Sequence, residues 1–193
     1  MSTLVTSTLL GTSANNWAID VDSDSYLYQA GMILQTVYLR TDSQSTFAAP
    51  VSGDGTTITP LQISITPKRA DSLLLCTWML NGEVNNNSVF TIHKDGAIIS
   101  TAGYEAYNNV VGNVRYSGVI SALYDVDTNS TMSNYYIQHV VPAGAITAAA
   151  YAPAVRSAGA TAYTFYLNRT AGSAGQDAYE ISVSTGMIQE IAQ

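Results

Sequence analysis

Charged residues are scarce in this sequence. Asp, Glu, Lys and Arg make up 11% of the 193 residues, whereas about a quarter is usual for a soluble protein. Apolar residues make up 47%, so much of the surface must be covered by Ser, Thr, Asn, Gly and the thirteen Tyr. Such a surface suits burial against other copies of the chain or against a larger body. An ordinary β-sandwich with a polar, uncharged surface would have the same composition.

Positive charge is the scarcer sign. Seven Lys and Arg stand against fourteen Asp and Glu, which gives a net charge of −7, and the largest basic cluster is Lys68-Arg69. Non-specific nucleic-acid binding needs a basic surface, so the sequence predicts no nucleic-acid partner. The longest apolar run, near Leu73, has about half the length that crosses a membrane, so no membrane insertion is expected. No positively charged leader with an apolar core is visible, and we expect no secretory signal.

One cysteine and two histidines leave little reactive chemistry. Cys76 cannot form an intrachain disulfide, and in an apolar stretch a cysteine usually behaves as a small buried hydrophobe. This pattern is typical of folding in a reducing cytoplasm, and it is compatible with later life outside the cell. His93 and His139 are both interpreted as strand residues at the surface. The serine elbow, the zinc-protease motif and the phosphate-binding glycine loop are all missing, so we predict that the protein is not an enzyme.

Two groups of carboxylates need a separate interpretation. Asp20, Asp22 and Asp24 would share one face of a strand and could bind calcium there. The glycine and distal glutamate of a calcium loop are missing, however, which favours solvated charge. Asp125 and Asp127 pose the same question, and a carboxylate pair also serves glycosidases. No glutamate lies in an apolar setting that would raise its pKa. We therefore predict no catalytic residue, no metal and no cofactor.

The clearest strands lie between residues 57 and 80. Leu61, Ile63 and Ile65 alternate with polar residues, which predicts a half-buried strand. Pro67 and the polar residues 68–71 then make a turn. Residues 73–80 are nearly continuous apolar, which predicts a strand covered on both faces in the middle of a sandwich. Trp78 is therefore expected in the core or at a subunit interface.

The whole chain reads as about nine or ten strands separated by turns, with no amphipathic helix. Asp95-Gly96, for example, lies between two strand-like stretches and predicts a hairpin. The predicted fold class is all-β, an antiparallel jelly roll or β-sandwich with a short N-terminal arm. Residues 1–44 would form the arm and first strand, and residues 45–193 the jelly-roll domain.

The first thirty residues are predicted to be an anchoring arm. They are too apolar for a solvated tail and too short for a core of their own. Such a segment could add strands to the sheet edge of a neighbour, or it could pack back on its own sandwich. The tyrosines in polar segments are the other candidates for a contact surface, because tyrosine combines a large area with a polar group. The interface candidates are Leu4, Leu9, Leu10, Trp17, Ile19, Tyr104, Tyr107 and Tyr116.

Four stretches also carry a family resemblance in their order along the chain. They are Ser64-Ile65-Thr66-Pro67 with the turn and apolar strand after it, residues 90–99 around Asp95-Gly96, the Asp/Thr-rich loop 124–131 with the aromatic strand after it, and residues 163–169 with 181–191, which end in Glu190-Ile191. This order resembles the jelly-roll domains of bacteriophage virion proteins, both head decoration (cement) proteins and tail-fibre tips. The resemblance covers roughly residues 45–193.

The resemblance implies a non-enzymatic structural protein of the virion surface, assembled in the host cytoplasm as a homotrimer. One expected role is a decoration protein that binds the major capsid protein or another virion protein and stabilises the head. The alternative is a receptor-binding tail-fibre tip that contacts host-surface glycan or protein. A fibre needs a long shaft, and only about thirty residues without heptads or repeats precede the predicted sandwich. We therefore expect the decoration role.

Overall fold

The computed structural model describes residues 27–99, 130–173 and 180–193. It also describes the backbone of five short strands outside these ranges: β1 (Thr8–Leu10), β2 (Ala18–Val21), β11 (Val110–Val111), β12 (Arg115–Tyr116) and β13 (Val119–Ser121). The helices among the described residues are two single 3-10 turns, η1 (Thr59–Leu61) and η2 (Ala171–Ser173). No helix in these described parts is long and apolar enough to cross a membrane.

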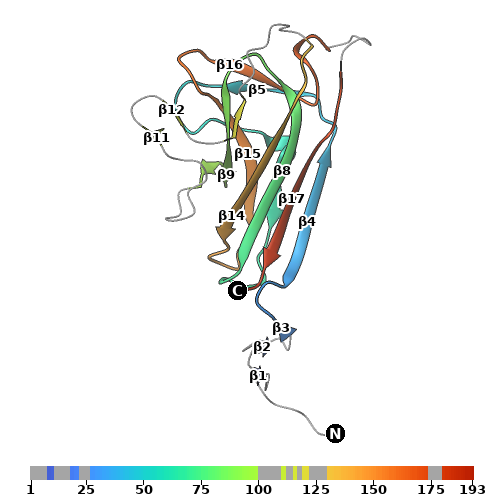
Figure 1. Cartoon of the computed structure of the whole chain (residues 1–193), viewed down its shortest axis with the longest axis vertical. Helices are drawn as coiled ribbons and strands as arrows, with labels where there is room; N and C mark the ends of the chain where they lie inside the picture. Colours follow the sequence, from blue (N-terminus) through green and yellow to red (C-terminus); the bar gives the residue numbers. More distant parts are fainter. Residues whose placement is uncertain are drawn as a thin grey trace.

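Two antiparallel sheets face each other (Figure 1). The first sheet has the order β4 (Ile33–Thr41), β17 (Ser184–Ile191), β8 (Leu73–Val84) and β14 (Ser133–Pro142), and it is extended at one end by β16 (Tyr163–Leu167) and β5 (Ser45–Ala49). In the second sheet, β6 (Thr56–Thr57) and β7 (Ile63–Ile65) pair with β15 (Ala149–Ser157), which pairs with β9 (Ser88–Lys94). The far edge of β9 pairs with β10 (Ala97–Ile98) and β13. The prediction of an all-β antiparallel sandwich is confirmed.

The pairing of these strands is nested along the chain. The first long strand, β4, pairs with the last, β17; β6 and β7 pair with β15; β8 pairs with β14; and β9 pairs with β13. A long hairpin whose two arms wrap together in this way gives two four-stranded sheets, which is the jelly-roll arrangement. The jelly roll expected from the sequence is therefore the observed topology.

The core lies between the two sheets and is built by alternate side chains. In β8 the inward residues Leu74, Cys76, Trp78 and Leu80 are fully buried. Burial raises the pKa of the Cys76 thiol to about 12, so the prediction of a small buried hydrophobe holds. The rings of Phe90, Tyr135 and Phe165 meet further along the core, with centroids 4.6 Å apart for the first two and 5.1 Å for Phe90 and Phe165.

Trp78 links the two sheets at the centre of this core. Its indole Nε1 donates a hydrogen bond of 2.9 Å to the carbonyl oxygen of Leu61, which lies at the entry to the second sheet. The neighbouring strand β17 has a glycine opposite the indole. A Cβ atom on Gly186 would lie 2.5 Å from two ring atoms of Trp78, so only glycine allows the ring to sit there.

The prediction that residues 73–80 are covered on both faces is wrong. The strand is central, as expected, and lies between β17 and β14. Its outward residues Leu73, Leu75 and Thr77 are only half-buried, and Met79 is 40% exposed. Each sheet of a sandwich turns one face to its partner sheet and the other outward, so the second row of an apolar run remains at the surface.

The hairpin predicted at Asp95-Gly96 is present. Ala97 and Ile98 of β10 pair with Lys94 and His93 of β9. Asp95 and Gly96 both have positive φ angles, 51° and 84°. Two positive φ angles give the turn the right-handed twist of the strands that flank it.

The strands that precede the sandwich pair with each other. In the described backbone, β1 pairs with β2, and β2 pairs with β3 (Leu27–Tyr28), in a small antiparallel sheet of their own. Its last residues are fixed to the end of the sandwich where the C-terminus lies (Figure 1). The backbone of Gly31 donates to the Ala192 carbonyl at 2.8 Å, and the Tyr28 ring lies 5.0 Å below the Arg69 guanidinium.

We expect Trp78→Ala to lower the free energy of unfolding by about 3–5 kcal/mol, because it removes a buried ring that no neighbouring side chain can replace. Ile146→Ala, in the exposed loop between β14 and β15, is the control and should change stability by about 0.5 kcal/mol or less. Urea denaturation measures both. A loss below about 1 kcal/mol for Trp78→Ala would contradict the central packing described for this ring.

Candidate functional site

The outer side of the first sheet is a broad exposed surface within the part of the chain that the structure describes. We call the outward side chains of β4, β17, β8 and β14 the open face. Its members are Ile33, Thr36, Tyr38, Arg40, Leu73, Leu75, Thr77, Met79, Asn134, Tyr136, Gln138, Val140, Pro142, Thr185, Met187, Gln189 and Ile191.

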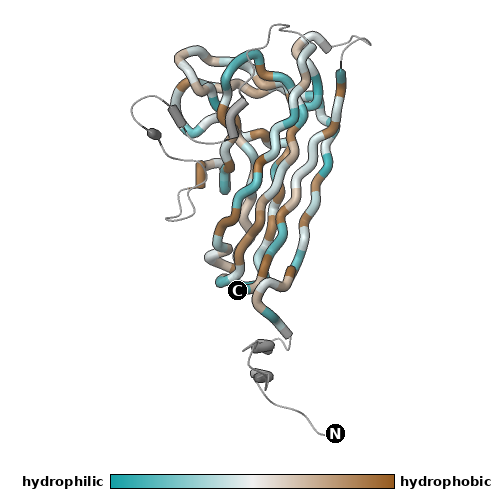
Figure 2. The backbone as a smooth tube through the Cα atoms, in the orientation of Figure 1, coloured by the Kyte–Doolittle hydropathy of each residue, from teal (hydrophilic) through white to brown (hydrophobic). Residues whose placement is uncertain are grey.

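Large apolar side chains are exposed across the open face. The exposed fraction is 62% for Tyr38, 54% for Tyr136, 50% for Ile33 and 40% for Met79. Backbone pairing places Tyr38, Tyr136 and Met79 in two adjacent rows across the sheet. One row is Tyr38, Met187, Thr77 and Gln138, and the next is Arg40, Thr185, Met79 and Tyr136. Hydrophobic residues recur along all four strands (Figure 2). An apolar surface of this extent is typical of a binding surface.

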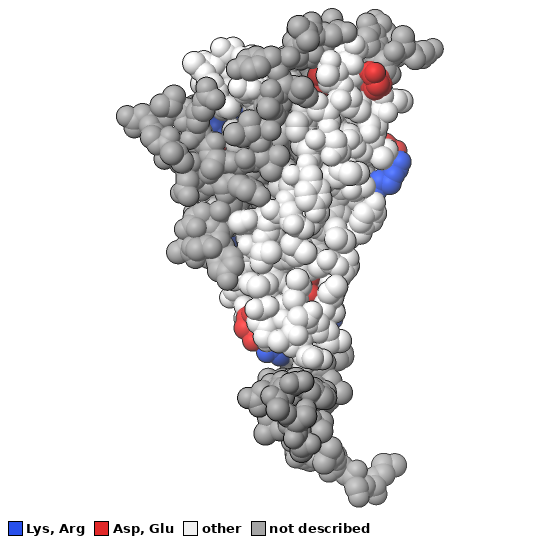
Figure 3. Space-filling model, viewed as in Figure 1, with Lys and Arg blue, Asp and Glu red and all other residues white. Residues whose placement is uncertain are grey.

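The open face carries almost no charge. Its one charged side chain is Arg40 on the edge strand β4, whose guanidinium lies 3.6 Å from the Asp42 carboxylate. Figure 3 shows this side of the molecule as uncharged surface, with charged atoms near its margin. A protein of net charge −7 therefore has one broad surface that another protein can approach without meeting like charge.

The second sheet is different, because its outer side is buried. Thr91, His93 and Arg156 point away from the core between the sheets, yet each is at most 2% exposed. Arg156 donates hydrogen bonds to the carbonyls of Val51 at 2.8 Å and Gly53 at 2.6 Å. The loop between β5 and β6 thus covers this sheet, and β9 and β15 are the strands buried on both faces.

His93 lies under the same loop, so its predicted surface position is wrong. Its Nδ1 is 2.8 Å from the Thr57 hydroxyl, and its Nε2 is 3.1 Å from the Asp54 carbonyl oxygen. A carbonyl can only accept, so Nε2 carries a proton and donates. Both ring nitrogens are engaged in holding the loop. His139 is half-buried near the end of β14.

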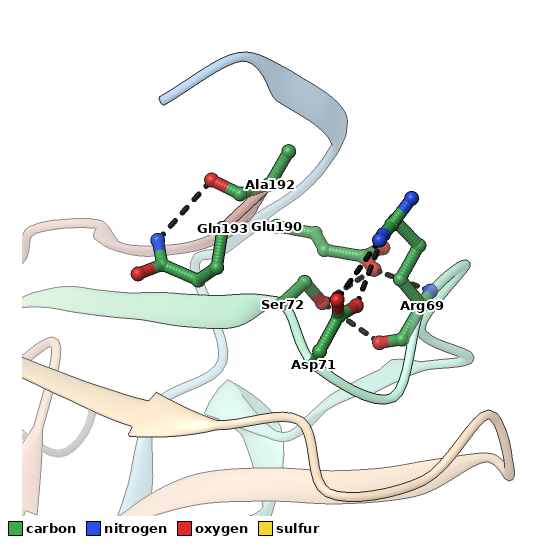
Figure 4. A network of polar contacts seen from close by, with 6 residues as sticks. All are labelled: Arg69, Asp71, Ser72, Glu190, Ala192 and Gln193. Carbon is green, nitrogen blue, oxygen red and sulfur yellow. Dashed lines mark hydrogen bonds and ion pairs between the residues drawn. The ribbon is translucent and has the colours of Figure 1, made fainter. Parts of the chain in front are cut away.

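Glu190, in the last strand, is a buried carboxylate at one end of the sandwich (Figure 4). It accepts hydrogen bonds from the backbone N–H of Lys68 at 2.9 Å and of Arg69 at 3.0 Å, from the Ser72 hydroxyl at 2.7 Å and from the Gln35 amide at 2.6 Å. Burial opposes its ionisation, but the hydrogen bonds outweigh burial and hold the pKa of Glu190 below its usual range. Glu190 therefore fastens the loop before β8 to the strands β4 and β17.

The loop is also fixed by its own ion pair. The Arg69 guanidinium binds both oxygens of Asp71, at 3.0 and 2.8 Å, and this hydrogen bonding holds the pKa of Asp71 below its usual range. The same guanidinium lies over Tyr28. The base of the N-terminal segment, the loop and the C-terminal strand thus meet at one end of the molecule.

A second candidate is an open groove beside β16. It has a volume of about 220 Å³ and is lined by Asn85, Ala162, Tyr163, Thr164 and Tyr166. The Arg169 guanidinium lies 5.1 Å from the centre of the Tyr166 ring. Aromatic rings beside amide and hydroxyl groups can contact a polar, ring-shaped ligand. The groove is open, and Tyr163 packs against the core while it lines the groove.

The structure does not test the interface residues chosen from the sequence. Leu4, Trp17, Tyr104 and Tyr107 lie outside the described residues, as do Asp22, Asp24, Asp125 and Asp127. Only the backbone is described for Leu9, Leu10, Ile19 and Tyr116, and it places Leu9 opposite Ile19 in the β1–β2 pair. Within the described residues, no group of three His, Cys, Asp or Glu could hold a metal ion.

The open face was not predicted from the sequence. Its signal was present in β4, where Tyr38 and Arg40 alternate with the inward residues Val37 and Leu39. The same signal occurs in β14, where Tyr136 alternates with Tyr135 and Ile137. Alternation shows that a strand has two faces, but it does not show whether the outer face is covered by another part of the chain.

Comparison with known proteins gives no family. No protein-family model matches the chain, and no curated protein matches it. Among solved structures, infectious bursal disease virus Gx strain matches with a TM-score of 0.36 and 12% identity over 95% of this chain and 50% of that chain. The infectious bursal disease virus VP2 subviral particle matches with a TM-score of 0.34 and 12% identity over 95% of this chain and 46% of that one. The chain thus spans about half the length of the structures it matches.

We expect Glu190→Gln to destabilise the protein at pH 7 by about 1–3 kcal/mol, because an amide leaves backbone donors unsatisfied. The folded-state pKa of Glu190 is lowered, so its contribution is present above the unfolded value of about 4.3 and is lost as pH falls through the folded value. Wild-type stability should therefore fall further than that of Glu190→Gln across this acid range.

Urea denaturation at a series of pH values measures this difference. Glu180→Gln is the matched control, because Glu180 is exposed. Equal acid dependence of wild type and Glu190→Gln would show that the carboxylate does not hold the loop.

Proposed function

We propose that this chain is a non-enzymatic structural protein of a bacteriophage particle, a decoration (cement) protein that docks on the head and stabilises it. The observation that carries the proposal is the open face, a broad, nearly uncharged sheet surface with exposed tyrosine and methionine side chains. Such a surface is suited to binding other proteins. The sequence resemblance to phage virion jelly rolls is the reason for proposing a phage particle and a decoration role.

In this proposal the N-terminal segment is the anchor. Its described strands β1, β2 and β3 pair with one another and not with the strands described in the sandwich. Strands outside the main sheets can add to a sheet edge of the major capsid protein or of another virion protein. The contacts of Gly31 with Ala192 and of Tyr28 with Arg69 would connect the anchored segment to the sandwich.

The proposed location is the virion surface, after assembly in the host cytoplasm. The resemblance further implies a homotrimer, and the low charge and many tyrosines are compatible with buried subunit contacts. The proposed partners are therefore other copies of this chain and a head protein, without nucleic acid or membrane insertion.

A second candidate function is a receptor-binding tail-fibre tip, and the groove beside β16 favours it. Tyr163 and Tyr166 line that groove together with the polar residues Asn85 and Thr164. This arrangement could contact a host-surface glycan. The decoration role remains the principal proposal because the groove is smaller than the open face and is open to solvent.

We expect a chain lacking residues 2–26 to fold with an unchanged β-sheet circular dichroism spectrum and to lose binding to undecorated particles. The truncation keeps Tyr28 and its contact with Arg69, so the end of the sandwich stays intact. Co-sedimentation with purified undecorated heads measures binding, with the full chain as control. Undiminished binding would move the anchor to the sandwich, and loss of folding would make the segment part of the domain core.

We expect incubation with host-surface polysaccharide to release no new reducing ends, because the proposed role needs no catalysis. Turnover that disappears when Asp125 or Asp127 is changed would overturn this expectation.

The same mixtures test the second candidate through glycan binding. A tail-fibre tip should bind the polysaccharide, and Tyr166→Ala should weaken that binding about tenfold or more, whereas a decoration protein should not bind it.

A further inference from the structure

We infer that the open face is the contact between copies of this chain, so that a second copy packs against β4, β17, β8 and β14. The inference rests on the proposed binding role of this face and names its occupant. The anchoring to the particle is assigned to a different part of the chain, the N-terminal segment. The two contacts can therefore be separated by experiment.

Charge is the first reason for choosing a second copy. Each chain carries a net charge of −7, so two copies repel each other over most of their surfaces. On the open face the one charged side chain is Arg40, at the edge and beside Asp42. Contact through this face leaves the acidic residues of both copies outside the interface. A strongly basic partner would gain no electrostatic attraction from such a surface. Two identical acidic copies, in contrast, can approach each other there without like-charge repulsion.

The composition of the face is the second reason. Gln138, Thr185 and Gln189 lie between the apolar side chains, and each can both donate and accept hydrogen bonds. A surface of hydroxyls, amides and apolar groups is compatible with its own image, as a contact using the same face on both copies requires. Such a contact joins the copies in pairs, so it predicts a dimer in place of the homotrimer that the resemblance implies. The Gln138 amide also donates to the Tyr136 hydroxyl at 3.1 Å, which orients that ring before any partner arrives.

Size and shape are the third reason. Four strands by the common length of β4, β17, β8 and β14 cover about 20 Å by about 30 Å, or about 600 Å² on each copy. Two copies would then bury about 1,200 Å², which reaches the range of stable specific interfaces. Sheets pack face to face when half-exposed side chains interleave, and Leu75, Met187 and Val140 are half-buried in this manner.

The contrast between the two sheets is the fourth reason. The chain covers the outer side of its second sheet with the 50–55 loop, down to the guanidinium of Arg156. Tyr38, Met79 and Tyr136 remain exposed on the first sheet, although their side chains are large and mainly apolar. A second copy would give the first sheet the covering that the second sheet receives from its own chain.

The test introduces charge at the centre of the face. Met79→Glu, and independently Tyr136→Glu, place a carboxylate on each copy where the two faces meet, and both sites are exposed enough for the single chain to fold. Ile146→Glu is the matched control, because Ile146 is 62% exposed in the loop between β14 and β15. Sedimentation equilibrium of the full chain gives the mass, and circular dichroism confirms folding.

We expect wild type and Ile146→Glu to form an assembly larger than the 20.5 kDa chain at micromolar concentration. Both face variants should raise its dissociation constant at least about tenfold, because like charges oppose each other in the contact. A monomeric wild type would overturn the inference. So would an assembly that neither face variant weakens.

Binding to undecorated heads separates this inference from the proposed function. Monomeric face variants that still bind heads would support both. A monomeric wild type whose head binding is lost in Met79→Glu would overturn the contact between copies and keep the decoration role, with the head as the occupant of the face. A wild-type assembly that does not bind heads would keep the contact between copies and overturn the decoration role.

Discussion

The packing of one indole ring fixes the position of the two sheets of this sandwich relative to each other. Trp78 extends from β8, donates to the Leu61 carbonyl across the core, and occupies the space that Gly186 leaves in β17. Three separate segments of the chain are thereby fixed at one point. The strands on either side of β8 are positioned by this contact, and so is the outer surface of the sheet that they form.

The two sheets serve different purposes once the core is fixed. Loop 50–55 covers the outer side of the second sheet, where buried polar groups such as His93 and Arg156 find backbone carbonyls. The first sheet keeps an outer side of uncharged polar and apolar groups. The low content of charged residues in the sequence is therefore reflected in the surface of the fold. Among the described residues it is evident on the open face, whose one charged side chain is Arg40.

Much of the fold could be predicted from local sequence patterns. Whether the outer face of a strand is covered by another part of the chain could not be predicted in this way. Period-two alternation and turn residues predicted the strands and the Asp95-Gly96 hairpin, because both depend on neighbouring residues. The apolar run at 73–80 predicted a central strand correctly, but not its exposed outer row. His93 was misplaced for the converse reason, since a loop almost forty residues earlier in the chain covers it. Glu190 was likewise visible as a residue, but its four donor groups lie on segments that only the tertiary fold brings together.

The nested pairing of the strands also sets the order in which the molecule can be completed. β4 finds its partner only when Ser184–Ile191 has been synthesised, so this edge of the first sheet stays unpaired until then. Pairing between such distant segments is slow compared with local folding. The surface that carries Tyr38 and Met187 side by side does not exist on a nascent chain. Recognition through it is thus restricted to chains in which β17 has been synthesised and paired, and chains that lack β17 are left out of any assembly built on that surface.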